Sequence, residues 1–419
     1  MASRGGTPVP DGWHEVRLGD AIVPSSVRRR PGEVEPEILS CSKDYGVIPQ
    51  NRLFGKRLAS ADTSRYKLVY PGDFVYDPNL LWSGAIARSS LEIAGLVSPV
   101  YEVFKAAELT DASFLAAWLK SPARLSQYRR VSVGTNVRRR RASMEDLASL
   151  PILLPPLPEQ RAIAAMLQSI DEAIERTDEV IAATERLRDA LLHELLTRGL
   201  PGHHTVWRDV PGLGTIPASW EVVRLGDVCE VISGYAMGPQ RAPQDHPRPY
   251  LTVANVHTDR VTVGELRYME LTDAEYASRS LRAGDLVVVE GHAQLSQLGR
   301  AAVVPPDAEG FAFQNHLFRV RLLGHGDLQF VCAFMNGPRG RAYFASFGGT
   351  TSGLNTVSAR NLRLLPLPWP NDAEQEAIAS TLDSVDVAIE RAREELAALQ
   401  SSKASTADAL LTGRVRVGS

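Results

Sequence analysis

The side chains best suited to catalysis occur in this sequence without the neighbours that known reactions require. An amino-methyltransferase needs a glycine-rich cofactor loop and an Asp/Asn-Pro-Pro-aromatic step, but the nearest fragment, Asp77-Pro78-Asn79-Leu80, lacks the second proline and the aromatic residue. A phosphate-binding loop needs G-x4-G-K-[S/T], and Gly55-Lys56-Arg57 lacks both the earlier glycine and the hydroxyl. No nucleophile elbow G-x-S-x-G is present. The sequence therefore does not predict an enzyme.

Histidine and cysteine residues do not form a metal site either. His203 and His204 have no partner at metal-ligand spacing, and we expect both to be solvated. His292 follows Gly291 in a polar stretch, where a lone histidine is more often a contact or surface residue than a base. The three cysteines are far apart and outside any CxxC spacing, which predicts buried thiols in a reducing compartment.

Length and composition are those of a multidomain protein of the cytoplasm. A chain of 419 residues exceeds what one core usually supports, so two or more domains are expected. Hydrophobic residues make up 44% and charged residues 23%, as in ordinary globular proteins. No apolar run approaches the roughly 20 residues that span a bilayer, and the N-terminal residues lack the apolar core of a secretory signal.

The net charge of −3 conceals a segregation of charge along the chain. Residues 112–144 contain eight basic side chains and no acid, and residues 311–371 contain six arginines against one aspartate. In contrast, residues 159–198 carry nine acids and five arginines, and residues 372–414 carry nine acids against four bases. Two basic regions separated by acidic ones are more informative about partners than the total charge.

The chain contains an internal duplication. The opening phrase VPDGWHEVRLGD (9–20) matches IPASWEVVRLGD (216–227) at seven of twelve positions, an offset of 207. At an offset of 215, EQRAIAAMLQSIDEAIER (159–176) matches EQEAIASTLDSVDVAIER (374–391), and Gly134-Thr135 falls on Gly349-Thr350. A period near 210 residues is too long for a solenoid repeat. A whole unit of globular region plus helix has been duplicated.

Each copy has the same predicted order of elements. Short β-type runs such as KLVYPGDFVY (67–76) and DLVVVE (285–290) contain or follow Pro-Gly and Ala-Gly turns. One helical segment is predicted at residues 112–128 and its counterpart at 328–344. Proline-rich hinges then end each mixed domain, because proline removes backbone donors and fixes φ.

Two long helices are predicted after the hinges. Their apolar or small residues recur in steps of four and three, which is an a/d seam. Both seams carry a cation at the same register, Arg188 and Lys403. The shared seam favours packing of the two helices on each other; the alternative is that each helix lies only on its own domain. The seam positions are Ile163, Leu167, Ile170, Ile174, Thr177, Ile181, Thr184, Leu191 and Leu195, then Ile378, Leu382, Val385, Ile389, Ala392, Leu396, Leu399 and Leu410.

The phrase PLPEQRAIAAMLQSIDEAIERTDEVI, followed by LLTRG, resembles the helical region of type I restriction–modification specificity subunits. The second copy departs from the family pattern with WPNDAEQ but keeps Glu374-Gln375 and the seam. The resemblance implies an α+β fold with two mixed α/β target recognition domains in a pseudo-twofold arrangement, joined by two long helices packed as an antiparallel coiled coil. The expected divisions are 1–155 (recognition domain 1), 156–198 (helix 1), 199–215 (linker), 216–370 (recognition domain 2), 371–412 (helix 2) and 413–419 (tail).

The same resemblance implies a non-catalytic DNA-reading subunit. Each recognition domain would read one half of a split site on double-stranded DNA, with the helices setting the distance between the halves. Two adenine-N6 methyltransferase subunits would dock around the helices, and a motor-nuclease (restriction) subunit could join them. S-adenosylmethionine, and ATP with magnesium, would be bound by those partners and no cofactor by this chain. The arginine-rich regions would then face phosphates.

Base reading requires forked donors and acceptors, such as arginine on guanine and asparagine or glutamine on adenine. We expect these groups in polar loops, for which the alternative is a solvated turn with capping hydroxyls. The candidates are Lys43, Asp44, Tyr45, Ser132, Thr135, Asn136, Arg138 and Arg139 in the first copy, and His292, Gln294, Ser296, Gln297, Thr350, Thr351, Ser352 and Asn355 in the second.

Two other classes of protein remain open at this point. One is a single-chain restriction–methylation enzyme with an unrecognised catalytic part, against which the missing cofactor loop argues. The other is a coiled-coil adaptor that does not bind DNA, which would not need two polar Gly-Thr loops near arginines.

Overall fold

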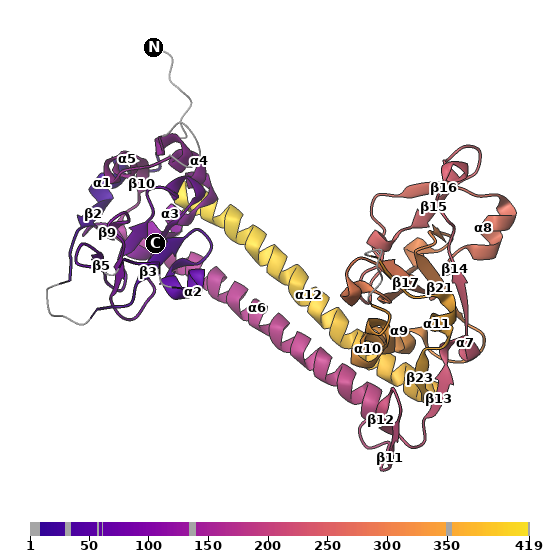
Figure 1. Ribbon diagram of the computed structural model, residues 1–419. Helices are drawn as coiled ribbons and strands as arrows, with labels where there is room; N and C mark the ends of the chain where they lie inside the picture. The colour runs from indigo at the N-terminus through magenta and orange to yellow at the C-terminus, as the bar shows by residue number, and fades with distance from the viewer. Residues whose placement is uncertain are drawn as a thin grey trace. The chain divides into compact units, whose positions relative to one another are not determined.

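A computed structural model of the protein describes residues 9–29, 35–56, 58–60, 62–133, 140–348 and 354–417 (Figure 1). The chain divides into two compact units. The first comprises Met1–Glu179 with Arg393–Ser419, and the second comprises Val180–Ala392. Each unit therefore contains one mixed domain, the first half of the helix that follows this domain, and the second half of the other long helix.

The first unit alternates short strands and short helices before its long helix. A four-stranded antiparallel sheet in the order β2-β9-β6-β7 forms its centre. The elements are β1 (His14–Arg17), α1 (Leu18–Ala21), β2 (Ile22–Ser25), β3 (Leu39–Ser42), β4 (Gly46–Pro49), α2 (Gln50–Phe54), β5 (Lys67–Val69), β6 (Phe74–Tyr76), η1 (Leu81–Ser83), β7 (Ile86–Arg88), β8 (Gly95–Val97), β9 (Glu102–Ala106), α3 (Ala112–Lys120), α4 (Pro122–Val131), α5 (Met144–Ala148), β10 (Pro151–Leu154) and α6 (Leu157–Arg198).

The second unit has a matching four-stranded antiparallel sheet, β14-β21-β17-β19, and a smaller sheet, β16-β15-β20. Its elements are β11 (Trp207–Val210), β12 (Gly214–Pro217), β13 (Glu221–Arg224), α7 (Leu225–Val228), β14 (Cys229–Ser233), η3 (Pro239–Arg241), β15 (Pro247–Leu251), η4 (Val253–Asn255), β16 (Arg267–Glu270), α8 (Asp273–Arg279), β17 (Leu286–Val289), β18 (Gly291–His292), η5 (Leu295–Gln297), β19 (Ala301–Val303), η6 (Pro306–Ala308), β20 (Ala312–Phe313), β21 (Leu317–Leu322), α9 (Leu328–Asn336), α10 (Pro338–Ala345), β22 (Asn355–Thr356), α11 (Ala359–Arg363), β23 (Pro366–Trp369) and α12 (Asp372–Leu411).

The repeated opening phrase forms the first strand of each mixed domain and does not lie in a polar loop. β1 pairs antiparallel with β10, and β13 pairs in the same way with β23, so each opening phrase lies beside the proline-rich hinge of its own copy. Trp13 and Trp220, which begin the two phrases, are both almost fully buried. The phrase therefore belongs to the structural framework that the two units share.

The predicted helical segments at 112–128 and 328–344 are each two helices. α3 ends at Lys120 and α4 begins at Pro122; α9 ends at Asn336 and α10 begins at Pro338. Proline suits the first turn of a helix because it lacks the backbone N–H that has no partner there. The prediction of one continuous helix in each copy was wrong, because Pro122 and Pro338 each begin a second helix.

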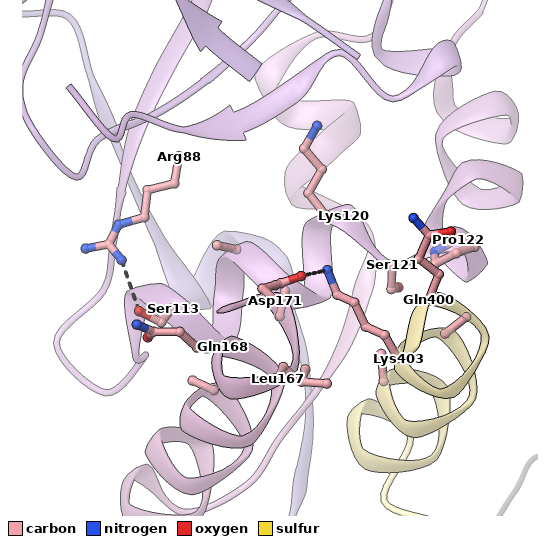
Figure 2. A pocket seen from close by; sticks show the side chains of 15 residues that line it. Arg88, Ser113, Lys120, Ser121, Pro122, Leu167, Gln168, Asp171, Gln400 and Lys403 are labelled. Atoms are coloured by element: carbon pink, nitrogen blue, oxygen red, sulfur yellow. Dashed lines mark hydrogen bonds and ion pairs between the residues drawn. The ribbon is translucent and has the colours of Figure 1, made fainter. Parts of the chain in front are cut away.

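The two long helices pack on each other antiparallel within each unit. Every predicted seam position is buried or half-buried in the structure. In the second unit, Arg188 Nε donates to Asp386 Oδ1 at 2.6 Å. In the first unit, Lys403 forms an ion pair with Asp171 (Figure 2). The two cations of the seam are therefore each neutralised by the opposite helix, and the predicted helix pairing is confirmed.

The segment expected to be a linker, 199–215, contains ordered structure. β11 and β12 form a hairpin, and Leu213 and Ile216 enter the core of the second unit. His204, expected to be solvated, approaches Glu374 with Nε2 2.7 Å from Oε1, and its side chain is only 11% exposed. The chain turns sharply after α6, at Gly199 with φ 74°, and this turn returns His204 to the start of α12.

Candidate nucleic-acid interface

A polar loop after strand β17 gathers all five of the described candidates of the second unit. β18 pairs with β22, which places His292 opposite Asn355. Asn355 Nδ2 donates to the carbonyls of His292 and Ala293 at 3.3 and 3.0 Å. The 3-10 helix η5 follows at once and carries Gln297 with Ser296. Residues distant in sequence thus form one polar surface at the end of the central sheet.

Within this surface, some candidates hold the loop together and others face solvent. The backbone N–H of Gln294 donates to His292 Nδ1 at 3.0 Å, and Gln297 accepts a hydrogen bond from Arg300. Gln294 and Ser296 are exposed. The exposed pair can reach a ligand without breaking internal hydrogen bonds, whereas Asn355 and Gln297 set the shape of the loop.

Two arginines that the sequence reasoning did not single out lie against η5. Arg341 donates to the Ser296 carbonyl at 2.7 Å, and Arg300 donates to the Val253 carbonyl at 2.7 Å. Burial, and secondarily the charge of Arg300, lowers the pKa of Arg341; burial also lowers the pKa of Arg300. In the described part of the chain, the ion pairs include no carboxylate bound to either guanidinium. This uncompensated positive charge beside polar side chains favours an anionic ligand.

In the first unit, the candidates Lys43, Asp44 and Tyr45 form the tip of the β3–β4 hairpin. All three are exposed, with 69% of Tyr45 accessible. Lys120, at the end of α3, donates from Nζ to the Lys43 carbonyl at 3.1 Å and so ties the hairpin to the basic helical region. A cation, an acid and an aromatic side chain stand together there, which suits contact with both phosphates and bases.

The remaining candidates lie outside the described residues, with one exception. Thr135, Asn136, Arg138, Arg139, Thr350, Thr351 and Ser352 are not among the residues that the structure describes. Ser132, which is described, follows the end of α4 and is only 5% exposed. We therefore withdraw Ser132 as a contact residue, because a base or phosphate cannot reach a buried hydroxyl. The neighbouring Val133 pairs with Arg141 in an antiparallel bridge.

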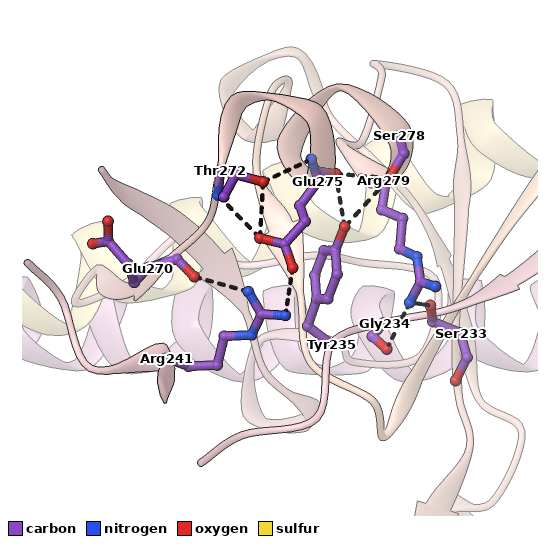
Figure 3. A network of polar contacts seen from close by, with 9 residues as sticks. All are labelled: Ser233, Gly234, Tyr235, Arg241, Glu270, Thr272, Glu275, Ser278 and Arg279. Carbon is purple, nitrogen blue, oxygen red and sulfur yellow. Dashed lines mark hydrogen bonds and ion pairs between the residues drawn. The ribbon is translucent and has the colours of Figure 1, made fainter. Parts of the chain in front are cut away.

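A second group of arginines in the second unit serves the fold (Figure 3). Tyr235 lies between Arg241 and Arg279, whose guanidinium carbons are 4.8 and 4.7 Å from the ring centroid. Arg241 donates to Glu275 at 2.7 Å, and Arg279 donates to the Ser233 carbonyl at 3.0 Å. These partners join α8 to the start of the domain. Unlike Arg300 and Arg341, the cations of this network have a structural role that their contacts explain.

The residues considered for catalysis occupy structural positions. Asp77 accepts a hydrogen bond from the Asn79 backbone at 2.9 Å within its own turn, and burial raises its pKa. The three cysteines are free and buried, as predicted; burial raises the pKa of Cys41 and Cys229 to about 12. In the ranges that the structure describes, no three His, Cys, Asp or Glu residues are grouped to hold a metal ion. Among the same residues, no helix is both long and apolar enough to cross a membrane.

Comparisons with known proteins agree with this architecture. The family model described as "Type I restriction modification DNA specificity domain" matches residues 101–185 and 217–400, more than half of the chain. The chain is 24% identical to the type I restriction enzyme MjaVIII specificity subunit of Methanocaldococcus jannaschii, with 98% of this chain and 95% of that protein covered. It is 22% identical to the EcoKI specificity subunit of Escherichia coli, over 68% of this chain and 60% of that protein.

Solved structures show the same fold. The HsdS subunit from Thermoanaerobacter tengcongensis superimposes with a TM-score of 0.53 at 19% identity, covering 98% of this chain and 99% of that one. The S subunit from M. genitalium gives 0.56 at 13% identity, covering 97% and 98%. The predicted fold class and the role in DNA specificity, with no catalysis of its own, are confirmed. By its sequence and its fold, this chain belongs to the family of type I restriction–modification DNA specificity subunits.

Proposed function

We propose that this chain reads a bipartite sequence on double-stranded DNA, with one half-site assigned to each mixed domain. The observation that supports this most directly is that the two units share their structural framework but differ in their polar loops. The two units share the Trp-to-Glu contact and the order of their central sheets. The polar loops differ. The loop after β17 carries His292 and Gln294, whereas the loop after the corresponding strand β6 carries Asp77 and Asn79, and the first unit presents Lys43 and Tyr45 on its β3–β4 hairpin. Two domains with the same structural framework but different polar loops are suited to recognising two different DNA half-sites.

The contact residues that we propose are the polar side chains of these loops. In the second unit, Gln294, Ser296 and Arg341 combine base-reading groups with an uncompensated cation. In the first unit, the proposal rests on Lys43, Asp44 and Tyr45. The candidates outside the described residues remain proposed DNA contacts on the basis of the sequence alone. The domain divisions given above are proposed on the same basis. Phosphate contacts would fix the position of each domain and the amide groups would read bases.

The long helices would act as a scaffold and spacer for partners. Their acid-rich composition opposes close contact with the phosphate backbone and leaves their exposed faces for proteins. The proposed partners are two adenine-N6 methyltransferase subunits carrying S-adenosylmethionine, and a motor-nuclease subunit with ATP and magnesium. We place this assembly in the cytoplasm.

The proposal is tested by co-expressing the chain with the methyltransferase subunit of its own system and mapping methylated adenines in the host DNA. A bipartite motif that appears only when both proteins are present supports the proposal. Methylation by this chain alone would indicate a single-chain enzyme. An absence of duplex DNA binding at low salt, with partners present, would indicate an adaptor instead.

A further inference from the structure

A cavity of about 500 Å³ lies in the first unit, between its mixed domain and the helix pair (Figure 2). Alanine side chains of α3, α6 and α12 form much of its wall, among them Ala117, Ala164 and Ala404. Arg88, Lys120 and Lys403 also line it. Among the described residues that line the cavity, Asp171 is the only acid, and it is already paired with Lys403. The cavity is thus an apolar space with excess positive charge.

The second unit shows what occupies the corresponding place there. Asp259, in a turn closed by the Val256–Val261 bridge, inserts its carboxylate toward the helix pair. Its Oδ2 lies 2.5 Å from Arg188 Nη2, and its Oδ1 accepts from Asn336 Nδ2 at 2.6 Å. Asp259 has a φ of 61°, a left-handed conformation that aspartate tolerates better than most residues. The turn therefore adopts a costly conformation that delivers a carboxylate to this position.

The duplication gives the counterparts of the residues that bind Asp259. At the offset of 215, Arg188 corresponds to Lys403. The helices α3 and α9, which both begin after a capping aspartate, are offset by 216, so Asn336 corresponds to Lys120. Cys332, whose Sγ is 3.6 Å from Asp259 Oδ1, corresponds to Ala116. Lys403, Lys120 and Ala116 all line the cavity of the first unit. The receiving side of the Asp259 contact is thus repeated, and among the described residues that line the cavity there is no acid besides Asp171 to take the place of Asp259.

We propose that this cavity is a docking site for an acidic segment of a partner protein, which inserts an aspartate or glutamate carboxylate where the second unit places Asp259. The charges are complementary, since Arg88, Lys120 and Lys403 face a space with one neutralised acid. The volume exceeds what a hydrated ion needs, and the alanine walls suit the apolar part of a peptide. The acid-rich composition of both long helices disfavours a DNA phosphate in this place. The partner supplies the carboxylate that the second unit provides from its own chain with Asp259.

The test uses the full-length protein with alanine methyl groups labelled for NMR. The probe is a cyclic peptide of residues 254–263, which contains the Asp259 turn, and its matched control is the same peptide with Asp259→Asn. We expect the aspartate peptide to shift the methyl signals of Ala117, Ala164 and Ala404 in a saturable manner. The control peptide should bind at least tenfold more weakly.

Two variants of the protein distinguish a specific site from surface attraction. Lys403→Gln should weaken binding of the aspartate peptide at least tenfold and should leave the weak binding of the control peptide unchanged. Ala117→Phe should fill the cavity and abolish the peptide-induced shifts of the methyl signals. A thermal unfolding midpoint close to that of the wild type shows that each variant is folded. Equal binding of the two peptides, or no shift with either at millimolar concentration, overturns the proposal. So does a short DNA duplex that shifts these methyls more than the aspartate peptide does, because the cavity would then receive phosphate.

Discussion

Trp220 Nε1 donates a 3.0 Å hydrogen bond to Oε2 of Glu374, which joins the opening phrase of the second copy to the start of its long helix. Trp13 makes the same contact with Glu159 at 3.1 Å in the first unit. A third group completes each site: His204 lies 2.7 Å from Glu374, and Arg416 donates to Glu159 at 2.6 Å. The glutamate of the Glu-Gln motif is therefore the point where the mixed domain, its own helix and the segment after the other helix meet.

Replacing this glutamate should destabilise the unit that contains it. Glu374→Ala leaves three nearly buried groups without their acceptor, the Trp220 indole, His204 and the Leu200 backbone N–H. We expect a loss of about 3 kcal/mol in the free energy of unfolding, measured by urea denaturation. Glu376→Ala, on the exposed face of the same helix, should change it by less than about 0.5 kcal/mol. Equal effects of the two substitutions would contradict this role.

The distance between half-sites should follow the length of the helix pair. In each of the ion pairs Asp171–Lys403 and Arg188–Asp386, the two residue numbers add to 574. The antiparallel helices α6 and α12 therefore keep the same register in both units. Deleting 177–183 together with 391–397 removes one heptad from each helix and keeps both the seam and this register. The helices become about 10 Å shorter, roughly three base-pair steps.

Methylation mapping of this double deletion should give unchanged half-sites with a shorter spacer. Deleting 177–183 alone is the control, because it breaks the register and should abolish methylation. A change in the half-site sequences would show that the helices do not set the spacing.

The uncompensated arginines beside η5 should contribute to the salt dependence of DNA binding. Each phosphate contact adds about 0.9 to the slope of log affinity against log salt. We expect Arg300→Gln and Arg341→Gln each to reduce both affinity and slope, as measured by fluorescence anisotropy at several salt concentrations. Arg391→Gln, on the exposed surface of α12, should alter neither. A slope that matches the wild type for both η5 variants would remove this surface from the DNA interface.

Glu275 should stabilise the second unit in a pH-dependent manner. The hydrogen bond from Arg241, with others from Thr272, lowers the pKa of Glu275 to about 2. Because the pKa in the unfolded chain is about 4.3, the stabilisation is present above that pH and is lost as pH falls toward 2. Glu275→Gln should therefore lower the denaturation midpoint at pH 7, and its difference from the wild type should shrink below pH 4. Glu265→Gln controls for the loss of an exposed acid; a difference that stays constant with pH would refute the assignment.

The repeat and the periodicity of the sequence were sufficient to predict the frame of the molecule. Apolar steps of three and four located both helices, and the matching cations Arg188 and Lys403 indicated that the helices share a seam. These features depend on the spacing of residues that are close together in the chain, which can be read from a single sequence without an alignment. The split of each short helical segment at Pro122 and Pro338 was not predicted, although proline suits the first turn of a new helix.

The contacts that join distant parts of the chain were not predictable in the same way. Nothing in the spacing relates Asp259 to Arg188, or His204 to Glu374, because each pair meets only when a turn brings the chain back. The candidate loop residues were chosen by chemical type, which does not reveal burial, and Ser132 was lost for this reason. Arg300 and Arg341 were not predicted because their importance lies in having no carboxylate within ion-pair distance among the described residues, which only the folded arrangement shows.

The central claim, that each domain reads its own half-site, is tested most directly by a domain exchange. Residues 9–150 would be replaced with the equivalent region of another member of the family, and the hybrid co-expressed with the methyltransferase subunit. Sequencing of methylated adenines should then give a bipartite motif in which one half has changed while the other half and the spacer stay as in the parent. A motif that changes in both halves, or one that is continuous, would contradict the account.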